Sequence, residues 1–327
     1  STPVLTDLTL DFGGLAVYDL YPSPLPDLFA GSQIVALGRY PEGGFTDITL
    51  TGALNNESLS YTYPQQYFSS DSRSDEIRFD SLPRLWATRK IGYLLNKIRL
   101  EGPDQETIDQ IVKLSIRFGI VTPYTSYLVT EENILGMDVQ ETIAADAYQQ
   151  ALTAPAEPAY GAGAVDKAAE QGQLSRADVA APIPQDIDQI LKTVGARTFI
   201  LQDGVWVDTA FDPQTMETLK VSFLSEDYFS LAASNPTLAA ALALGQQVIV
   251  ISGENVYEII ASDQPADILV LPTPIIINTQ PSLTQATTTS VPDSNPSHSP
   301  KPLLPGLCTG SFIPLFAIGL WLIYRKQ

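Results

Sequence analysis

Residues 82–119, LPRLWATRKIGYLLNKIRLEGPDQETIDQIVKLSIRFG, decide the fold that we expect for this chain. In the first half of this stretch, apolar residues recur at i, i+3, i+4 and i+7, namely Ile91, Leu94, Leu95 and Ile98. This spacing puts four apolar side chains on one face and predicts a helix that buries that face.

A second helix is predicted after Gly102. Pro103 suits the first helical position, where its missing N–H costs nothing, and Asp104 suits the positive end of the helix dipole. Gly119 is predicted to close this helix in the left-handed conformation. The stretch therefore predicts a pair of helices.

Alternating apolar and polar residues before the helix pair predict β-strands. We expect strands near residues 4–12, 33–40, 45–54 and 58–64. These strands would form part of a β-sandwich, and they are too few to close one. We therefore expect partner strands upstream, in a longer polypeptide.

The chain after the helix pair divides by composition. Residues 131–183 are rich in Ala, Gln, Glu and Pro, which predicts a linker with one short helix near 138–150. Residues 184–262 predict a small α+β domain. It has a helix near Ile187 to Leu191, a hairpin turning at Asp203-Gly204, two short helices broken at Pro236, and a last hairpin through Gly253.

The C-terminal end predicts a membrane anchor. Residues 263–302 become rich in Ser, Thr and Pro, which is typical of an extended stalk. Residues 303–324 contain no charged side chain and match the length of a transmembrane helix. The basic tail at 325–327 would lie in the cytoplasm. The predicted anchor residues are Leu303, Phe312, Leu315, Ile318, Leu320, Trp321, Tyr324, Arg325 and Lys326. The alternative for this segment is a buried core helix.

Composition excludes several classes of function. The 327 residues carry 37 acidic and 18 basic side chains, a net charge of −19, so nucleic acid is an unfavourable partner. The single histidine, His298, and single cysteine, Cys308, exclude a Cys/His zinc site and an intrachain disulfide. We predict no catalytic residue, no cofactor and no metal.

The predicted helix pair holds seven basic residues: Arg84, Arg89, Lys90, Lys97, Arg99, Lys113 and Arg117. One interpretation is a solvated helix face, and the other is a patch that binds a polyanion.

Three local motifs carry little functional weight. Gly161-Ala162-Gly163 lacks the third glycine of a dinucleotide fingerprint, so we interpret it as flexible chain. Asp208-Thr209-Ala210 is similar to an aspartic protease motif, but Ala replaces Gly and no second copy exists. We interpret Asp208 as a surface residue on a hairpin. Trp206 is interpreted as a core or strand-surface tryptophan, and the alternative is an aromatic ring that stacks on a ligand.

Residues 82–95 followed by residues 111–129 resemble the region after the von Willebrand A domain in inter-alpha-trypsin inhibitor heavy chain-like proteins. The matching elements are Leu85-Trp86-Ala87, Leu114-Ser115 and the run from Val121 to Ser126. Residues 19–40 resemble the segment that follows the A domain in bacterial members. The resemblance covers about residues 1–130, and it implies a VIT domain and an A domain upstream. The family's Asp-x-Ser-x-Ser metal motif does not occur in this sequence.

We therefore expect an α+β chain: a partial β-sandwich with a two-helix pair (residues 1–130), a linker, a small C-terminal α+β domain and a C-terminal transmembrane helix. The predicted function is that of a non-enzymatic, membrane-anchored, extracellular or periplasmic support region of an adhesion or matrix-binding protein. Its partners would be the upstream VIT and A domains, the lipid bilayer and an extracellular protein or polysaccharide. The alternatives are a carboxylate-based extracellular hydrolase and a polyanion-binding module.

Overall fold

The computed structural model describes residues 3–55, 57–69, 81–125, 134–154, 161–185 and 187–261. The chain divides into two units, Ser1–Leu269 and Val270–Gln327, and all described residues belong to the first. The predicted stalk, transmembrane helix and tail lie outside the described residues. Within the described ranges, no helix is both long enough and apolar enough to cross a membrane.

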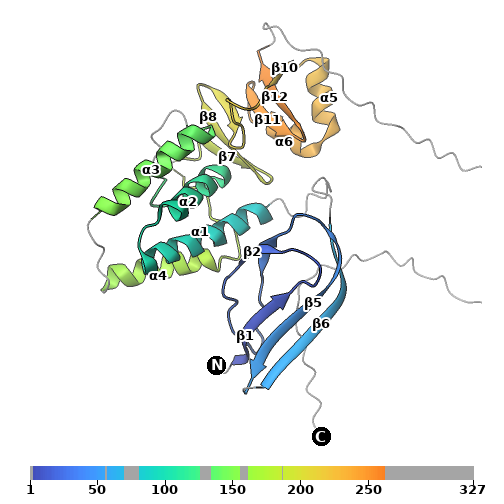
Figure 1. Ribbon diagram of the computed structural model, residues 1–327. Helices are drawn as coiled ribbons and strands as arrows, with labels where there is room; N and C mark the ends of the chain where they lie inside the picture. The colour runs from blue at the N-terminus through green and yellow to red at the C-terminus, as the bar shows by residue number, and fades with distance from the viewer. Residues whose placement is uncertain are drawn as a thin grey trace, which may run out of the picture. The chain divides into compact units, whose positions relative to one another are not determined.

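The described part is a mixed α+β structure, as the sequence predicts (Figure 1). Its N-terminal strands are β1 (Pro3–Asp11), β2 (Tyr18–Tyr21), β3 (Leu28–Phe29), β4 (Leu37–Arg39), β5 (Gly44–Leu54) and β6 (Glu57–Phe68). Its first four helices are α1 (Leu82–Glu101), α2 (Gln105–Phe118), α3 (Met137–Thr153) and α4 (Ala162–Ser175). The C-terminal elements are β7 (Leu191–Val194), β8 (Arg197–Gln202), β9 (Val205–Asp208), β10 (Leu219–Ser222), α5 (Glu226–Ser234), α6 (Pro236–Leu242), β11 (Val248–Ser252) and β12 (Asn255–Ile260).

The N-terminal sheet has the strand order β3-β1-β5-β6, and β2 and β4 form a separate two-stranded ribbon. Leu5 and Leu8 of β1 are buried against Leu28, and Leu25 and Ile34 pack against the same cluster. A proline-rich loop, rather than a second sheet, therefore covers the core face. The predicted strand at 33–40 shortens to β4, and only the residues that pair with β2 are extended.

Helices α1 and α2 confirm the predicted helix pair. Their buried faces include Ile91 and Leu95 of α1 and Ile108 of α2. Pro103 is not in the second helix, which begins at Gln105, because the Asp104 side chain accepts a hydrogen bond from the Thr107 N–H and acts as the N-cap. Gly119 ends α2 with φ 61°, as predicted.

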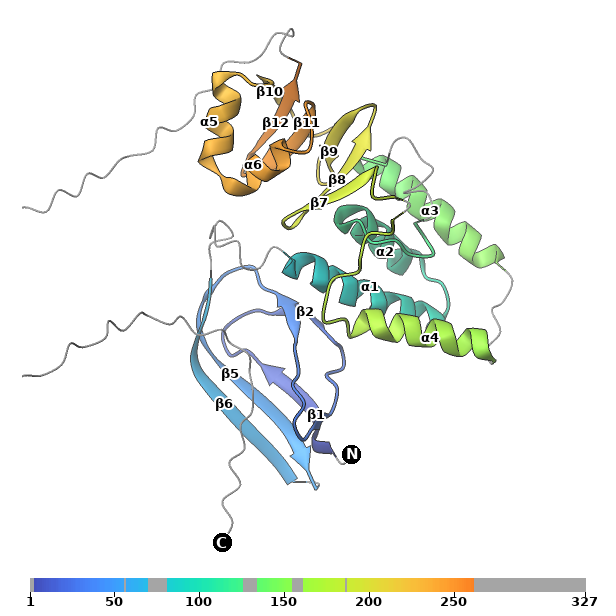
Figure 2. The ribbon, with the colours of Figure 1, turned by 180° about the vertical axis from the view of Figure 1, so that it is seen from behind.

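The segment that the sequence presents as a linker contains two helices. The predicted helix near 138–150 corresponds to α3, whereas α4 was not predicted. Both views place α4 alongside α1 (Figures 1 and 2), and the two helices are in contact. Gly92 of α1 permits this approach, because a Cβ atom there would lie 2.7 Å from the Leu174 carbonyl carbon.

The C-terminal sheet has six strands in the order β10-β12-β11-β9-β8-β7. The pairs β9/β11 and β10/β12 are parallel, and the other neighbouring pairs are antiparallel. The predicted hairpins at Gly204 and Gly253 and the helix break at Pro236 are confirmed. The predicted helix at 187–191 is wrong: residues 187–190 form turns and Leu191 begins β7.

Both faces of this sheet are covered. Ile200, Val207 and Val256 share one core with residues of α2 and α3. Side chains alternate along a strand, so Phe199, Trp206 and Val250 are buried on the opposite face. Helices α5 and α6 cover that face: α6 contacts β7 and β11, and α5 contacts β10. The sheet is therefore part of one core with α2 and α3, which precede it in the sequence.

Candidate functional site

The seven basic residues of the helix pair all have partners within the chain. Arg84 donates to the Phe118 and Gly119 carbonyl oxygens. The other lysine and arginine contacts at the exposed end of the pair are Lys97 with Thr107, Arg99 with Asn96, and Lys113 with Asp109. Arg89, Lys90 and Arg117 lie in the networks described below. Arg89 is buried among these contacts, whereas Arg99 is exposed and the Lys113 and Arg117 side chains are 38% and 42% exposed.

Arg89 is the centre of the most buried of these networks. Its side chain is 2% exposed and donates from Nε to the Ala177 carbonyl oxygen, at 2.8 Å. Its Nη1 donates to the carbonyl oxygens of Tyr21 and Val35. Burial lowers the pKa of the guanidinium, while Asp178, 3.7 Å away, opposes that shift. Arg89 therefore ties α1 both to the N-terminal ribbon and to the chain that follows α4.

A second network joins α1 to the ribbon through Asp19. The Trp86 indole N–H donates to the Asp19 carbonyl oxygen at 2.9 Å, and Lys90 Nζ lies 2.8 Å from the Asp19 carboxylate. The Arg39 guanidinium lies over the rings of both Trp86 and Tyr18, at 5.2 and 5.4 Å from the ring centroids. These are cation–π contacts, which hold the ribbon strands against the helix.

A third network lies where α2 meets the hairpin β8–β9. The Asp208 carboxylate is fully buried and accepts from Arg117 Nη1 at 3.2 Å, Arg197 Nη1 at 2.8 Å and the Ala210 N–H at 2.9 Å. The interpretation of Asp208 as a surface residue is therefore wrong. Asp208 is buried by tertiary packing, because Arg117 comes from a helix some ninety residues earlier in the sequence. The hairpin sequence alone therefore does not show that Asp208 is buried.

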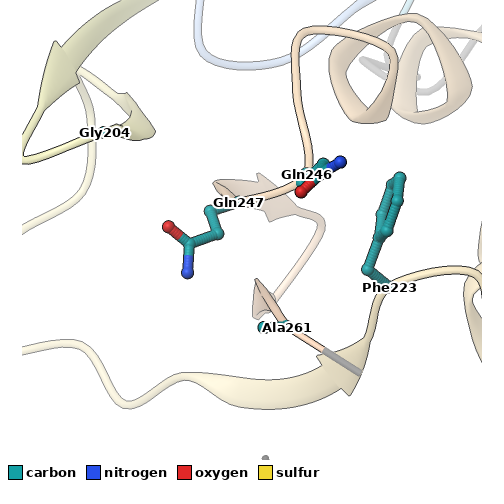
Figure 3. Close-up of a pocket in the computed structure, with 5 residues that line it drawn as sticks. All are labelled: Gly204, Phe223, Gln246, Gln247 and Ala261. Carbon is teal, nitrogen blue, oxygen red and sulfur yellow. The ribbon is translucent and has the colours of Figure 1, made fainter. Parts of the chain in front are cut away.

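The described surface also contains a polar hollow at the ends of four strands of the six-stranded sheet, β9 to β12. It is lined by Gly204, Phe223, Gln246, Gln247 and Ala261, and its volume is ≈ 320 Å³ (Figure 3). A second hollow lies between the proline-rich loop, α1 and α4, where burial and the Asp19 carboxylate raise the pKa of Tyr21. No carboxylate lines either hollow.

The sequence did not identify the hollow, because its lining residues come from separate segments and have no motif spacing. Trp206, which the sequence left as either a core or a strand-surface residue, is buried at 7% exposure, with Lys192 Nζ 4.8 Å from its ring centroid. Among the described residues, no group of His, Cys, Asp and Glu side chains is arranged to hold a metal ion. The predicted anchor residues, from Leu303 to Lys326, lie outside the described part of the chain.

The fold and these networks define a class of protein: an α+β module in which lysine and arginine side chains link elements from different parts of the chain. Comparison with known proteins then relates the chain to inter-alpha-trypsin inhibitor heavy chains. Heavy chain H3 of Rattus norvegicus is 31% identical over 140 residues, which are 40% of this chain and 16% of the relative. Heavy chain H4 of Homo sapiens is 26% identical over 138 residues, and heavy chain H2 of Mus musculus is 28% identical over 144 residues.

These matches confirm the predicted relation to the heavy chains. Each covers 40% of this chain and only 15–16% of the relative's length. No family model and no solved structure matches the chain.

Proposed function

We propose that the chain is a non-enzymatic support region of an extracellular protein of the VIT and von Willebrand A type. The observation that carries the proposal is the similarity to several inter-alpha-trypsin inhibitor heavy chains over 40% of the chain. In this proposal the chain is the part that follows an A domain in a longer, bacterial polypeptide. The upstream VIT and A domains would be its partners, and the A domain would contact the ligand.

The N-terminal sheet supports this role. Strand β6 is an edge strand of 12 residues, and among the described strands it pairs only with β5. Its run from Ser58 to Phe68 contains no charged side chain. Tyr67 in this run and Phe45 opposite it on β5 are 62% and 75% exposed. An uncharged edge strand offers unpaired backbone groups to another strand. We propose that an upstream domain covers this edge.

The networks around Trp86, Arg89 and Lys90 explain how such a region would keep its elements together under load. Trp86, Arg89 and Lys90 fix α1 to the ribbon β2–β4, and Arg89 also holds the segment after α4. Buried charges tolerate displacement poorly, because a separated partner leaves an uncompensated charge. We therefore expect α1, the ribbon and the segment after α4 to move together when the upstream domain pulls on the chain.

Hydrogen exchange tests the support role. We would compare the full chain with a longer polypeptide that includes the upstream domains. The β6 amides should gain protection in the longer polypeptide, whereas those of β11 and β12, which lie inside the six-stranded sheet, should be unchanged. Equal β6 exchange in the two polypeptides would refute the proposed contact.

We also propose that residues 303–324 span a cell membrane, with the C-terminus in the cytoplasm. The support is the uncharged run followed by Arg325 and Lys326. Phase partition in a nonionic detergent tests it: the full chain should enter the detergent phase, and a variant ending at residue 302 should stay in the aqueous phase. Recovery of the intact chain from the aqueous phase would refute the anchor.

The observations do not favour the two alternatives, a carboxylate-based hydrolase and a polyanion-binding module. The hydrolase requires paired carboxyl groups in a pocket, and the two hollows are lined by none. The polyanion-binding module requires accessible cations on the helix pair, and Arg89 and Lys90, at 2% and 13% side-chain exposure, are held by contacts with other elements.

A further inference from the structure

The hollow in Figure 3 lies where four neighbouring strands of the six-stranded sheet end. Gly204 precedes β9, and Gln246 and Gln247 precede β11, whereas Phe223 follows β10 and Ala261 follows β12. The pairs β9/β11 and β10/β12 are parallel and β11 pairs antiparallel with β12, so these four strand ends lie side by side at one end of the sheet. Segments that are distant in sequence meet at this end of the sheet and form a concave surface, which is the shape that ligand sites have.

Backbone hydrogen bonds fix the lining segments. The Trp206 N–H donates to the Gln247 carbonyl oxygen at 3.0 Å, and the Phe223 N–H donates to the Ile260 carbonyl oxygen at 2.8 Å. Both bonds extend the sheet ladder by one residue into the rim of the hollow. The lining is therefore positioned by the sheet rather than by a free loop, which favours a preformed site.

The polar part of the lining consists of two neutral amides. Gln246 is exposed and Gln247 is half-buried, and Figure 3 shows their side chains pointing to different sides of the rim. An amide side chain offers two N–H donors and a carbonyl acceptor, so it can donate a hydrogen bond to a hydroxyl group or accept one from it. No ionisable side chain lines the hollow.

The apolar part of the lining is the ring of Phe223. Tyr228 packs edge-to-face against it, with centroids 5.3 Å apart and planes at 74°, and Phe229 packs against Tyr228 in the same manner at 5.4 Å. These contacts hold the Phe223 ring in place. A fixed aromatic ring beside hydrogen-bonding groups suits a ligand with one apolar and one polar face.

We propose that this hollow binds a neutral sugar residue. A pyranose ring presents C–H groups on its faces and hydroxyl groups on its rim, which matches one aromatic ring and two amides. A volume of ≈ 320 Å³ lies at the small end of ligand sites and suits a single ring. The net charge of −19 and the uncharged lining disfavour an acidic saccharide. This proposal does not rest on the proposed membrane anchor or on the proposed upstream A domain.

Ligand-observed NMR on the full chain tests the proposal, with tetra-N-acetylchitotetraose, cellotetraose and maltotetraose as neutral probes and tetragalacturonate as the acidic comparison. At least one neutral probe should bind at concentrations up to about 10 mM, more strongly than the acidic one. The double variant Q246A/Q247A should weaken that binding about tenfold or more, because it removes both amides.

Three further variants show whether binding depends on the hollow. F223L removes the ring and should weaken binding several-fold, while circular dichroism checks that the variant is folded. Q173A removes an exposed amide of α4, and F29L removes an exposed ring of β3, both outside the hollow, and neither should change binding. Absence of binding by every neutral probe, or binding that the double variant leaves unchanged, would overturn the proposal.

Discussion

Two glycines in neighbouring helices should respond in opposite ways to the same substitution. Gly92 lies in the middle of α1, and Gly172 lies in the last turn of α4. At Gly92 an added Cβ would lie 2.7 Å from the Leu174 carbonyl carbon, and it would come closer still to the Ser175 backbone nitrogen. At Gly172 an added Cβ would meet no atom within 4 Å.

The magnitudes follow from two competing effects. Replacing glycine by alanine within a helix stabilises by about 0.5–1 kcal/mol, because glycine loses more backbone entropy on folding. Overpacking costs about 1–3 kcal/mol, and the obstructing atoms at Gly92 are backbone atoms, which cannot rotate away. We therefore expect G92A to lower the free energy of unfolding by about 1–2 kcal/mol and G172A to raise it by up to about 1 kcal/mol.

Urea denaturation of the full chain and of each variant, followed by circular dichroism, measures both changes. Hydrogen exchange adds a local readout, since G92A should also lower the protection of α4 amides by separating α4 from α1. If G92A stabilised the chain as much as G172A does, the close packing of α4 on α1 would be refuted.

Three further substitutions test two of the networks and the N-cap of α2. Asp208→Asn should cost about 2 kcal/mol in urea denaturation, because two part-exposed arginines lose their carboxylate; an unchanged midpoint would contradict the network. Trp86→Phe should cost about 1–2 kcal/mol in the same assay, since the Asp19 carbonyl oxygen loses its donor, and no loss would show that water replaces the indole. Hydrogen bonds from the Thr107 hydroxyl and N–H lower the pKa of Asp104, so Asp104→Ala should destabilise at pH 7. That difference should narrow as the pH falls through the lowered pKa, because the protonated carboxyl no longer stabilises the helix start; thermal melts that show a constant difference would refute the cap.

The local elements were largely predictable from the sequence. The helix stripe through Ile91 and Leu95 is a local pattern, and so is the left-handed end at Gly119. The turns at Gly204 and Gly253 follow from glycine's freedom to adopt positive φ, which is 83° and 64° there. Each of these features depends on residues within one or two turns of each other, so periodicity and turn residues are sufficient to predict them.

The candidate site was not predictable in this way. Its lining comes from four strand ends between residues 204 and 261, and two parallel strand pairs bring them together. A parallel pair joins segments that are distant in sequence, and no local spacing records it. The α4 helix was missed for a related reason: its sequence has no clear apolar face, and it is held by close approach to Gly92 rather than by a stripe of its own.

The sequence by itself determined the α+β class, the helix pair, the hairpins and the relation to the heavy chains, because each is written in residues that are near one another or in a recognisable run. Only the tertiary structure decided which charges are buried. Arg89 and Asp208 look like ordinary surface residues in the sequence, yet each is enclosed by groups from other elements. Burial depends on what packs against a residue, and for these two the packing partners lie up to about ninety residues away.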